Sequence, residues 1–255
     1  MKKSLILLAA GIFLQACKKD TKDPDPTPVV PNEKGSATIT INNTIDNAPL
    51  QLGTMFKNIN GDSIKVNKYM YYISNVVLTK SDGAKFVEPA SYHLINQADN
   101  ATWSFNLTNI PAGNYKSVSF LIGVDSLSNV SGAQEGDLAP SKGMFWTWTT
   151  GYIMLKLEGY SPQSGAAGGG ITYHVGGFKG VNNTLRTVNI NFTGDLVVSK
   201  SGNPKLKIKS ELNQLFKNPV NIQVSSLYYV MSMGEDAVKL ADNYKDMFTF
   251  ESITP

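Results

Sequence analysis

The segment Gly143-Met-Phe-Trp-Thr-Trp-Thr-Thr-Gly-Tyr-Ile-Met-Leu-Lys-Leu-Glu-Gly159 gathers two of the chain's three tryptophans between glycines. Side chains of an extended chain point alternately to opposite sides, so Trp146 and Trp148 are predicted to share one face. Phe145, Thr147 and Thr149 would then lie on the other face. After Gly151 the apolar residues alternate again, as they do in a strand with one buried side. The segment therefore predicts two strand pieces joined at Gly151.

Short strand-like segments of the same kind recur along the chain, separated by turns rich in glycine, asparagine and proline. They cover residues 37–41, 63–78, 91–96, 102–107, 115–122, 171–175, 187–192, 205–209 and 220–226. Helical spacing is scarce and falls near the C-terminus, in residues 211–216 and 235–248. This pattern predicts an all-β protein, namely an antiparallel β-sandwich of immunoglobulin-like type in a single elaborated domain with a short C-terminal helix.

The N-terminus is typical of a bacterial lipoprotein signal. Lys2 and Lys3 precede an apolar run over residues 5–14, which is shorter than the roughly 20 residues of a transmembrane helix. Leu14-Gln-Ala-Cys17 follows, and its similarity to lipobox sequences implies removal of residues 1–16 and a diacylglycerol thioether on Cys17. Such an anchor would attach the chain stably to a membrane. The alternative is a plain signal peptide with an incidental cysteine.

Residues 17–35 are predicted to form the lipidated end of a disordered tether, because Lys18–Pro31 is charged and rich in proline and offers nothing to bury. The globular domain is predicted over residues 36–255. We expect it to lie in the cell envelope on a lipid anchor in the outer membrane, either on the periplasmic face or on the cell surface.

The charge of the chain excludes a nucleic-acid partner. Removal of Lys2 and Lys3 with the signal leaves 21 basic and 20 acidic residues, so the mature chain is nearly neutral. Lys205, Lys207 and Lys209 alternate with apolar residues, which is the pattern of a solvated strand face rather than of a basic patch.

The sequence also gives no sign of an enzyme. It has no Gly-x-Ser-x-Gly nucleophile motif. Asp125 and Glu158 are best explained by structural roles in turns and on a strand surface. We therefore predict no catalytic residues.

The chain has two histidines, His93 and His174, each in a strand-like segment beside a tyrosine. Each is either an ordinary sheet histidine with a hydrogen-bond partner or a metal ligand. Two imidazoles and a lipidated Cys17 cannot make a Cys/His zinc site. Copper(I) accepts few ligands and soft thioether donors, so a copper site with histidine and methionine is chemically sensible.

Three further segments stand out beside residues 143–159, namely Phe120-Leu-Ile-Gly-Val-Asp-Ser126, Asn129-Val-Ser-Gly-Ala-Gln134 and Tyr173-His-Val-Gly-Gly-Phe178. With these four segments, the chain resembles a known family, the MbnP-like copper-associated periplasmic proteins and lipoproteins, over roughly residues 37–250. The resemblance implies an association with copper. In some members the metal site combines histidine imidazoles with kynurenine, an oxidised tryptophan made by a di-haem cytochrome c peroxidase-like partner.

Carried onto this sequence, the resemblance marks Trp146 and Trp148 as the signature tryptophans, either of which could be the one modified. It marks His174 as the histidine after the glycine-rich loop, with His93 as the second metal-ligand candidate. Met144 is a further residue expected to line the site. The two-histidine hypothesis places both imidazoles near the tryptophan face, around one copper(I) ion.

Methionine sulfur would be the other soft donor. Met144, Met154, Met231 and Met233 lie in aromatic or strand-like contexts, where core filling is the commoner use of methionine. Met231-Ser-Met233 points two thioethers to one side of an extended chain. Some family members have a further histidine near this point, where this chain has Tyr228-Tyr-Val-Met-Ser-Met233.

A surface lipoprotein that binds carbohydrate or protein ligands through exposed aromatics is the alternative function. Stacking platforms must be reachable from solvent, so exposed tryptophans would favour it. Buried Trp146 and Trp148 beside His174 would favour the metal site.

Overall fold

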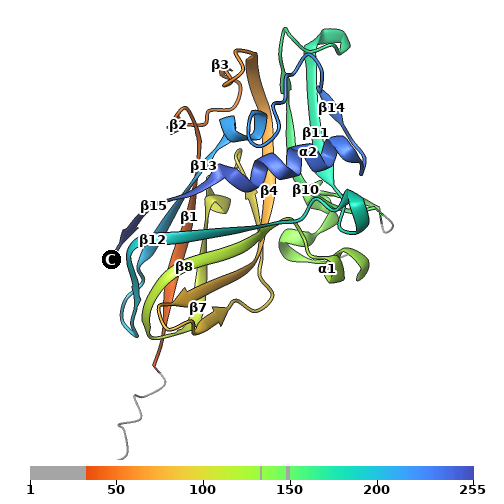
Figure 1. Ribbon diagram of the computed structural model, residues 1–255. Helices are drawn as coiled ribbons and strands as arrows, with labels where there is room; N and C mark the ends of the chain where they lie inside the picture. Colours follow the sequence, from red (N-terminus) through yellow and green to blue (C-terminus); the bar gives the residue numbers. More distant parts are fainter. Residues whose placement is uncertain (1–32, 133, 148–149) are drawn as a thin grey trace, which may run out of the picture. The chain divides into compact units, whose positions relative to one another are not determined.

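The computed structural model describes residues 33–132, 134–147 and 150–255, which form two β-sheets packed face to face (Figure 1). The predicted signal peptide, Cys17, most of the tether and Trp148 lie outside the described residues. Within the described residues, no helix is long and apolar enough to span a membrane.

The smaller sheet has β1 at its centre. Its strands are β1 (Lys34–Ile45), β2 (Ala48–Pro49), β7 (Ser104–Pro111), β13 (Lys205–Glu211) and β15 (Phe248–Thr254). β13 runs parallel to β1, whereas the other neighbours in this sheet pair antiparallel.

The larger sheet is built on the long strand β4. Its strands are β3 (Met55–Lys57), β4 (Ser63–Lys80), β5 (Lys85–Val87), β6 (Tyr92–Asn96), β8 (Gly113–Ile122), β9 (Phe145–Thr147), β10 (Gly151–Tyr160), β11 (Gly170–Gly176), β12 (Arg186–Val198) and β14 (Tyr229–Val230). One edge of β4 pairs with β3, β6 and β5 in turn, and the other edge pairs with β10 and β8. β11 continues the sheet beyond β10, and β14 lies parallel to β11 at the edge.

Two α-helices and several 3-10 turns complete the described part of the chain. The α-helices are α1 (Ser126–Val130) and α2 (Glu235–Tyr244). The 3-10 turns are Asn100–Trp103, Gly136–Leu138, Pro140–Lys142, Ala167–Gly169, Gly180–Asn182, Leu212–Phe216 and Lys245–Met247.

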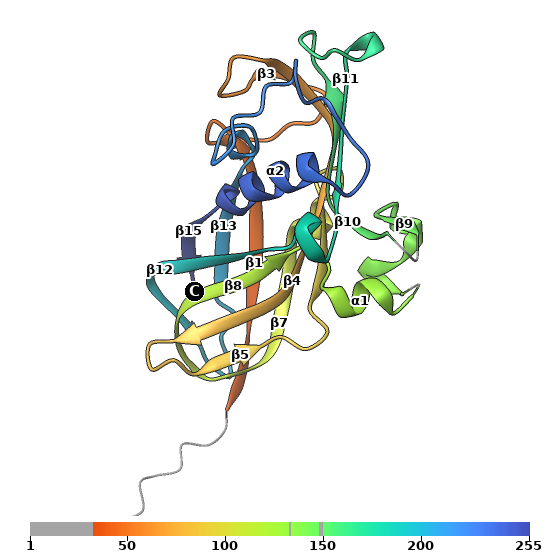
Figure 2. The same cartoon turned by 45° about the vertical axis from the view of Figure 1, so that its right-hand side comes forward.

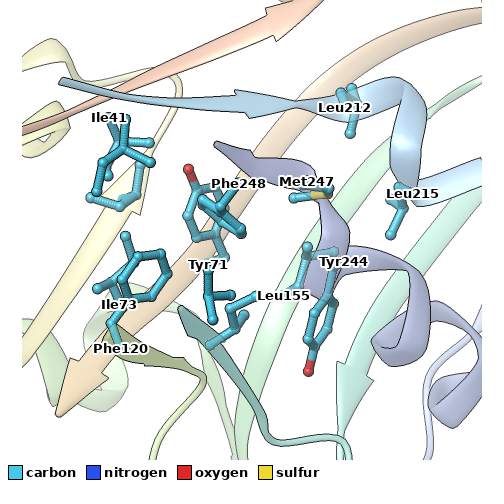
Figure 3. Close-up of a cluster of buried hydrophobic side chains, with 14 of the residues drawn as sticks. Ile41, Tyr71, Ile73, Phe120, Leu155, Leu212, Leu215, Tyr244, Met247 and Phe248 are labelled. Carbon is cyan, nitrogen blue, oxygen red and sulfur yellow. The ribbon is translucent and has the colours of Figure 1, made fainter. Parts of the chain in front are cut away.

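The first hydrophobic core lies between the two sheets. Tyr69, Tyr71 and Ile73 of β4 are buried in it, and we call the side of the larger sheet that carries them the inner face. Tyr71 meets Phe248 edge to face with ring centroids 5.7 Å apart, and Phe248 meets Phe120 in the same way at 5.3 Å (Figure 3). Helix α2 buries its apolar side in the same core, through Ala237, Leu240, Ala241 and Tyr244.

A second, smaller core covers the opposite side of the larger sheet, which we call the outer face. Met70 and Tyr72 belong to it, because alternate residues of β4 point to opposite sides. Its other buried members are Leu94, Val124, Leu138, Met144, Tyr152, Ile153, Met154 and Phe178. Several of them come from residues 124–147, and Figure 2 shows α1 and β9 from this stretch on the side of β10 away from α2.

The structure confirms the predicted β-sandwich with a short C-terminal helix, although its sheets are mixed because two strand pairs are parallel. The domain begins with β1 at Lys34, slightly before the predicted boundary.

The predicted strand 220–226 is wrong. The backbone N–H and C=O of Val220 hydrogen-bond to the amide of Asn243 at 2.8 and 2.7 Å instead of to a neighbouring strand. The predicted helix 235–248 ends early, and Phe248 starts β15.

Candidate functional site

The indole of Trp146 lies across Gly176, at the end of β11. A Cβ added to Gly176 would lie 2.6 and 2.9 Å from two atoms of the indole. Real Cβ atoms essentially never lie within 3.0 Å of such an atom. The glycine thus makes room for the ring, and Trp146 is half-buried against the second core. Phe145, the preceding residue, also packs on this core, with its ring centroid 4.9 Å from that of Tyr152. Phe145 and Trp146 therefore both pack on the second core, although the alternation of side chains predicts that they point to opposite sides of the strand.

The other residues of the segment His174-Val-Gly-Gly-Phe178 are also explained by local contacts. Gly177 has φ of +130°, and a Cβ there would lie 2.3 Å from the carbonyl oxygen of Asn182. Phe178 is buried in the second core, and its carbonyl accepts a hydrogen bond from Ser126 Oγ at 2.8 Å. The motif therefore ends β11 and attaches it to helix α1.

The residues around Gly151 are also held by close contacts and hydrogen bonds. Gly151 has φ of +71°, and a Cβ there would lie 2.1 Å from Oδ1 of Asn129. That oxygen accepts the backbone N–H of Tyr152 at 2.8 Å, while the amide of Asn129 donates to the carbonyl of Asp125 at 3.0 Å. Asp125 caps α1 by accepting the N–H of Ser128. The predicted structural role of Asp125 is thereby confirmed.

His174 lies on the outer face, level with Lys156 of β10 and Met70 of β4. Its Nε2 is 2.9 Å from Oε1 of Glu158, a diagonal neighbour on β10. The other oxygen of Glu158 is 3.1 Å from Nζ of Lys68. His174 is thus oriented by a carboxylate that is itself held by a lysine.

The charges around this pair favour a neutral imidazole and an ionised carboxylate. Burial lowers the pKa of His174 below its ordinary value of 6.5, and the nearby positive charges of Lys156 and Lys68 lower it further, despite the hydrogen bond to Glu158. Burial alone would raise the pKa of Glu158, but hydrogen bonds from His174 and Lys68 leave this pKa below its ordinary value. Burial lowers the pKa of Lys156, whose ammonium donates to the carbonyl of Gly143.

This arrangement leaves one ring nitrogen of His174 ready to bind a metal. An ionised Glu158 can only accept, so Nε2 carries the hydrogen and Nδ1 carries the lone pair. No described residue hydrogen-bonds to Nδ1. A histidine that donates to a carboxylate through one nitrogen and offers the other is the usual form of a metal-ligating imidazole.

His93 has a different environment. Its ring stacks on Phe105 with centroids 3.7 Å apart, and its Nε2 is 2.9 and 3.1 Å from the two carboxylate oxygens of Glu88. It pairs with Ile73 on β4 and so lies on the inner face. Stacking on Phe105 and a hydrogen bond to a carboxylate are the contacts of an ordinary sheet histidine.

The structure therefore does not bring the two histidines together. Paired residues of neighbouring strands share a face, so His93 follows Ile73 to the inner face and His174 follows Met70 to the outer face. Their strands are also three positions apart in the sheet, roughly 14 Å at the usual strand spacing. One ion cannot bind both rings, and the two-histidine expectation does not fit this geometry.

The remaining candidates are placed as follows. Met144 is fully buried in the second core, where it fills space. Trp148 lies outside the described residues, so its predicted face is not described. In the described part of the chain, no three His, Cys, Asp or Glu side chains gather into a metal-binding group. Trp103 donates its Nε1–H to the carbonyl of Asn96 at 3.0 Å, which is a structural role.

The aromatic side chains are mostly covered. Across residues 33–132, 134–147 and 150–255, Tyr229 is the one aromatic side chain that is largely exposed, at 61%. A single ring is not a stacking platform, so the described surface does not favour ligand binding through exposed aromatics.

The sequence did not reveal Glu158 as the partner of His174. The alternation of side chains along residues 151–158 predicted only that Glu158 and Lys156 point to the same, solvent-facing side of the strand. The missing information was the register of β10 against β11, which sets Lys156 level with His174 and Glu158 diagonal to it. The two segments do form one antiparallel hairpin, and a trial pairing of them would have put the carboxylate within reach.

Fold and site together define a two-sheet β protein whose outer face carries a carboxylate-oriented histidine, with a half-buried tryptophan over the glycine two residues further along the same strand. The chain belongs to the MbnP family, whose family model matches residues 34–232. Among solved structures, MbnP from Methylosinus trichosporium has the same fold, with a TM-score of 0.58 over 87% of this chain and 98% of that one, at 15% identity. No curated protein matches the sequence.

Proposed function

We propose that this protein is a lipid-anchored protein of the cell envelope that binds or handles copper through His174 and does not itself catalyse a reaction. The family relation supports a copper-related role. The observation that carries the proposal is the His174–Glu158 pair at 2.9 Å, since it presents a neutral imidazole whose second nitrogen has a free lone pair. Copper would supply a soft cation for that nitrogen.

The location of Trp146 supports a role for an oxidised tryptophan. The indole covers Gly176, two residues beyond His174 and on the same face of β11. Kynurenine formed there would add an amine and a ketone beside the imidazole. Trp148 is the other tryptophan that could be the one modified. The oxidation would be carried out by a di-haem cytochrome c peroxidase-like partner in the same compartment.

Residues 1–17 support the location in the cell envelope. A lipid on Cys17 would attach the domain to the outer membrane, on its periplasmic face or at the cell surface.

The test compares two histidine variants of protein purified from its native host, where the proposed modifying partner would be present. His174→Ala should lose most of the copper measured by metal analysis. His93→Ala is the matched control, because His93 is also a largely buried strand histidine paired with a carboxylate but lies on the inner face. Intact mass of the same samples reports oxidation of tryptophan. Equal copper in His174→Ala and wild type would contradict the proposal.

A further inference from the structure

We infer that Met231 and Met233 supply thioether sulfurs to the metal bound at His174, which makes this a site for a soft monovalent cation with one nitrogen and two sulfur donors. The inference rests on the proposed function, because it takes His174 as the first ligand. It assigns a purpose to the Met231-Ser-Met233 sequence, which the fold does not otherwise use.

The register of the edge strand places Met231 beside His174. β14 runs parallel to β11, with Tyr229 level with Thr172 and Val230 level with Tyr173. Val230 and Tyr173 are both buried in the first core, so both point to the inner face. β14 ends at Val230; continued by one residue in the same register, Met231 would stand level with His174, with both side chains on the outer face. Residues level with each other on neighbouring strands are about 5 Å apart.

Met233 lies against the glycine end of β11. Its Cγ lies 3.4 Å from the point that a Cβ on Gly177 would occupy. Gly176, the preceding residue, is the one covered by the indole of Trp146. The two glycines therefore have the tryptophan and the methionine as direct neighbours, two and three residues beyond His174.

Exposure separates these methionines from the structural ones. Met144, Met154 and Met247 are fully buried, and the sulfurs of Met154 and Met247 accept hydrogen bonds from Val124 N–H and Tyr69 O–H. Met231 is 42% exposed and lines a surface cavity of about 400 Å³, so its side chain is not needed for packing.

The chemistry of this donor set selects the ion. A thioether is neutral and soft, and His174 is neutral too, so the three donors bring no charge of their own. Such a set suits copper(I) and silver(I) and is poor for hard or strongly charged cations. The carboxylate of Glu158 behind the imidazole supplies the compensating negative charge.

The test is an anaerobic titration of the mature full chain in detergent with copper(I), in competition with a chromogenic chelator, and with silver(I). Met231→Leu and Met233→Leu keep the side-chain volume and remove the sulfur. Each should weaken binding by roughly tenfold or more, because one of three donors is lost. X-ray absorption of the copper complex should show sulfur neighbours in wild type and none in the double variant.

Met55→Leu is the matched control, since Met55 is 47% exposed on β3 and pairs with Lys65 near the start of β4, whereas His174 is level with Met70. It should bind like wild type. Wild-type affinity and sulfur scattering in the double variant, with binding still lost in His174→Gln, would overturn this inference and leave the proposed function standing. Equal weakening in Met55→Leu would overturn it too. Absence of copper(I) and silver(I) binding in wild type would overturn both.

Discussion

Glu158 and His174 form a diagonal pair across β10 and β11, with one carboxylate oxygen 2.9 Å from Nε2 of the ring. The pair is largely shielded from solvent, and the positive charges of Lys68 and Lys156 surround it. Together these contacts fix the ring orientation and the position of its hydrogen. The same contacts make the pair a source of pH dependence.

We predict that the protein loses stability as the pH falls below about 6.5, the ordinary pKa of histidine. The pKa of His174 is lower in the folded chain, so the unfolded chain binds the proton first and acid favours unfolding. His174→Gln should remove this part of the dependence, seen as a flatter plot of unfolding midpoint against pH.

A second decline should follow at lower pH, because the folded pKa of Glu158 is also lowered. The stability that this carboxylate contributes is present above its ordinary pKa of 4.5 and is lost as the pH falls towards the folded value. Glu158→Gln should remove the second decline. A pH profile unchanged in both variants would contradict the assigned ionisation states.

We predict that Gly176→Ala displaces the indole of Trp146, since the new Cβ would lie 2.6 Å from the ring. Overpacking of this kind costs about 1–3 kcal/mol. The measurements are the free energy of unfolding and tryptophan fluorescence. Gly170→Ala is the control within the same strand, because nothing lies within 4 Å of its Cβ position. Equal effects of the two substitutions would show that Trp146 does not depend on Gly176.

Sequence patterns predicted much of this fold because most of its strands are amphipathic. The alternation in residues 151–158 and the glycine at 151 were enough to predict β9 and β10 as two strand pieces, which the structure has. β4 is buried on both faces, so its mixed run of tyrosines predicted a strand but not the existence of two cores.

The arrangement of the candidate site could not be predicted in the same way. Whether His93 and His174 share a face depends on pairing across β6, β4, β10 and β11, and the sequence gives no register between strands so far apart. The segment after Phe216 was misjudged for a related reason. Ile222 and Val224 are buried, but the amide of Asn243 satisfies the backbone of Val220 and the carboxylate of Asp62 accepts the N–H of Val224, and both contacts are distant in sequence.

We predict that Cys17→Ala abolishes labelling of the protein by a fatty-acid analogue and releases it from the membrane fraction. The basis is the short apolar run that ends in Leu14-Gln-Ala-Cys17, the chain's one cysteine. Labelling in growing cells followed by fractionation measures both effects. Cys17→Ala protein that is labelled as strongly as wild type would refute lipidation at this residue.

Finally, we predict that deletion of residues 18–31 leaves the midpoint of thermal unfolding nearly unchanged, whereas a deletion extended to Thr38 lowers it. The charged, proline-rich segment has nothing apolar to bury. The chain from Glu33 onward does contribute, because the carbonyl of Glu33 accepts the N–H of Ala112 at 2.8 Å and Lys34 begins the pairing of β1 with β7. The longer deletion also removes the fully buried Ala37. A loss of about 2 kcal/mol would lower the midpoint by about 4–8 °C in a domain of this size. A large drop on the shorter deletion would show instead that the segment packs against the folded domain.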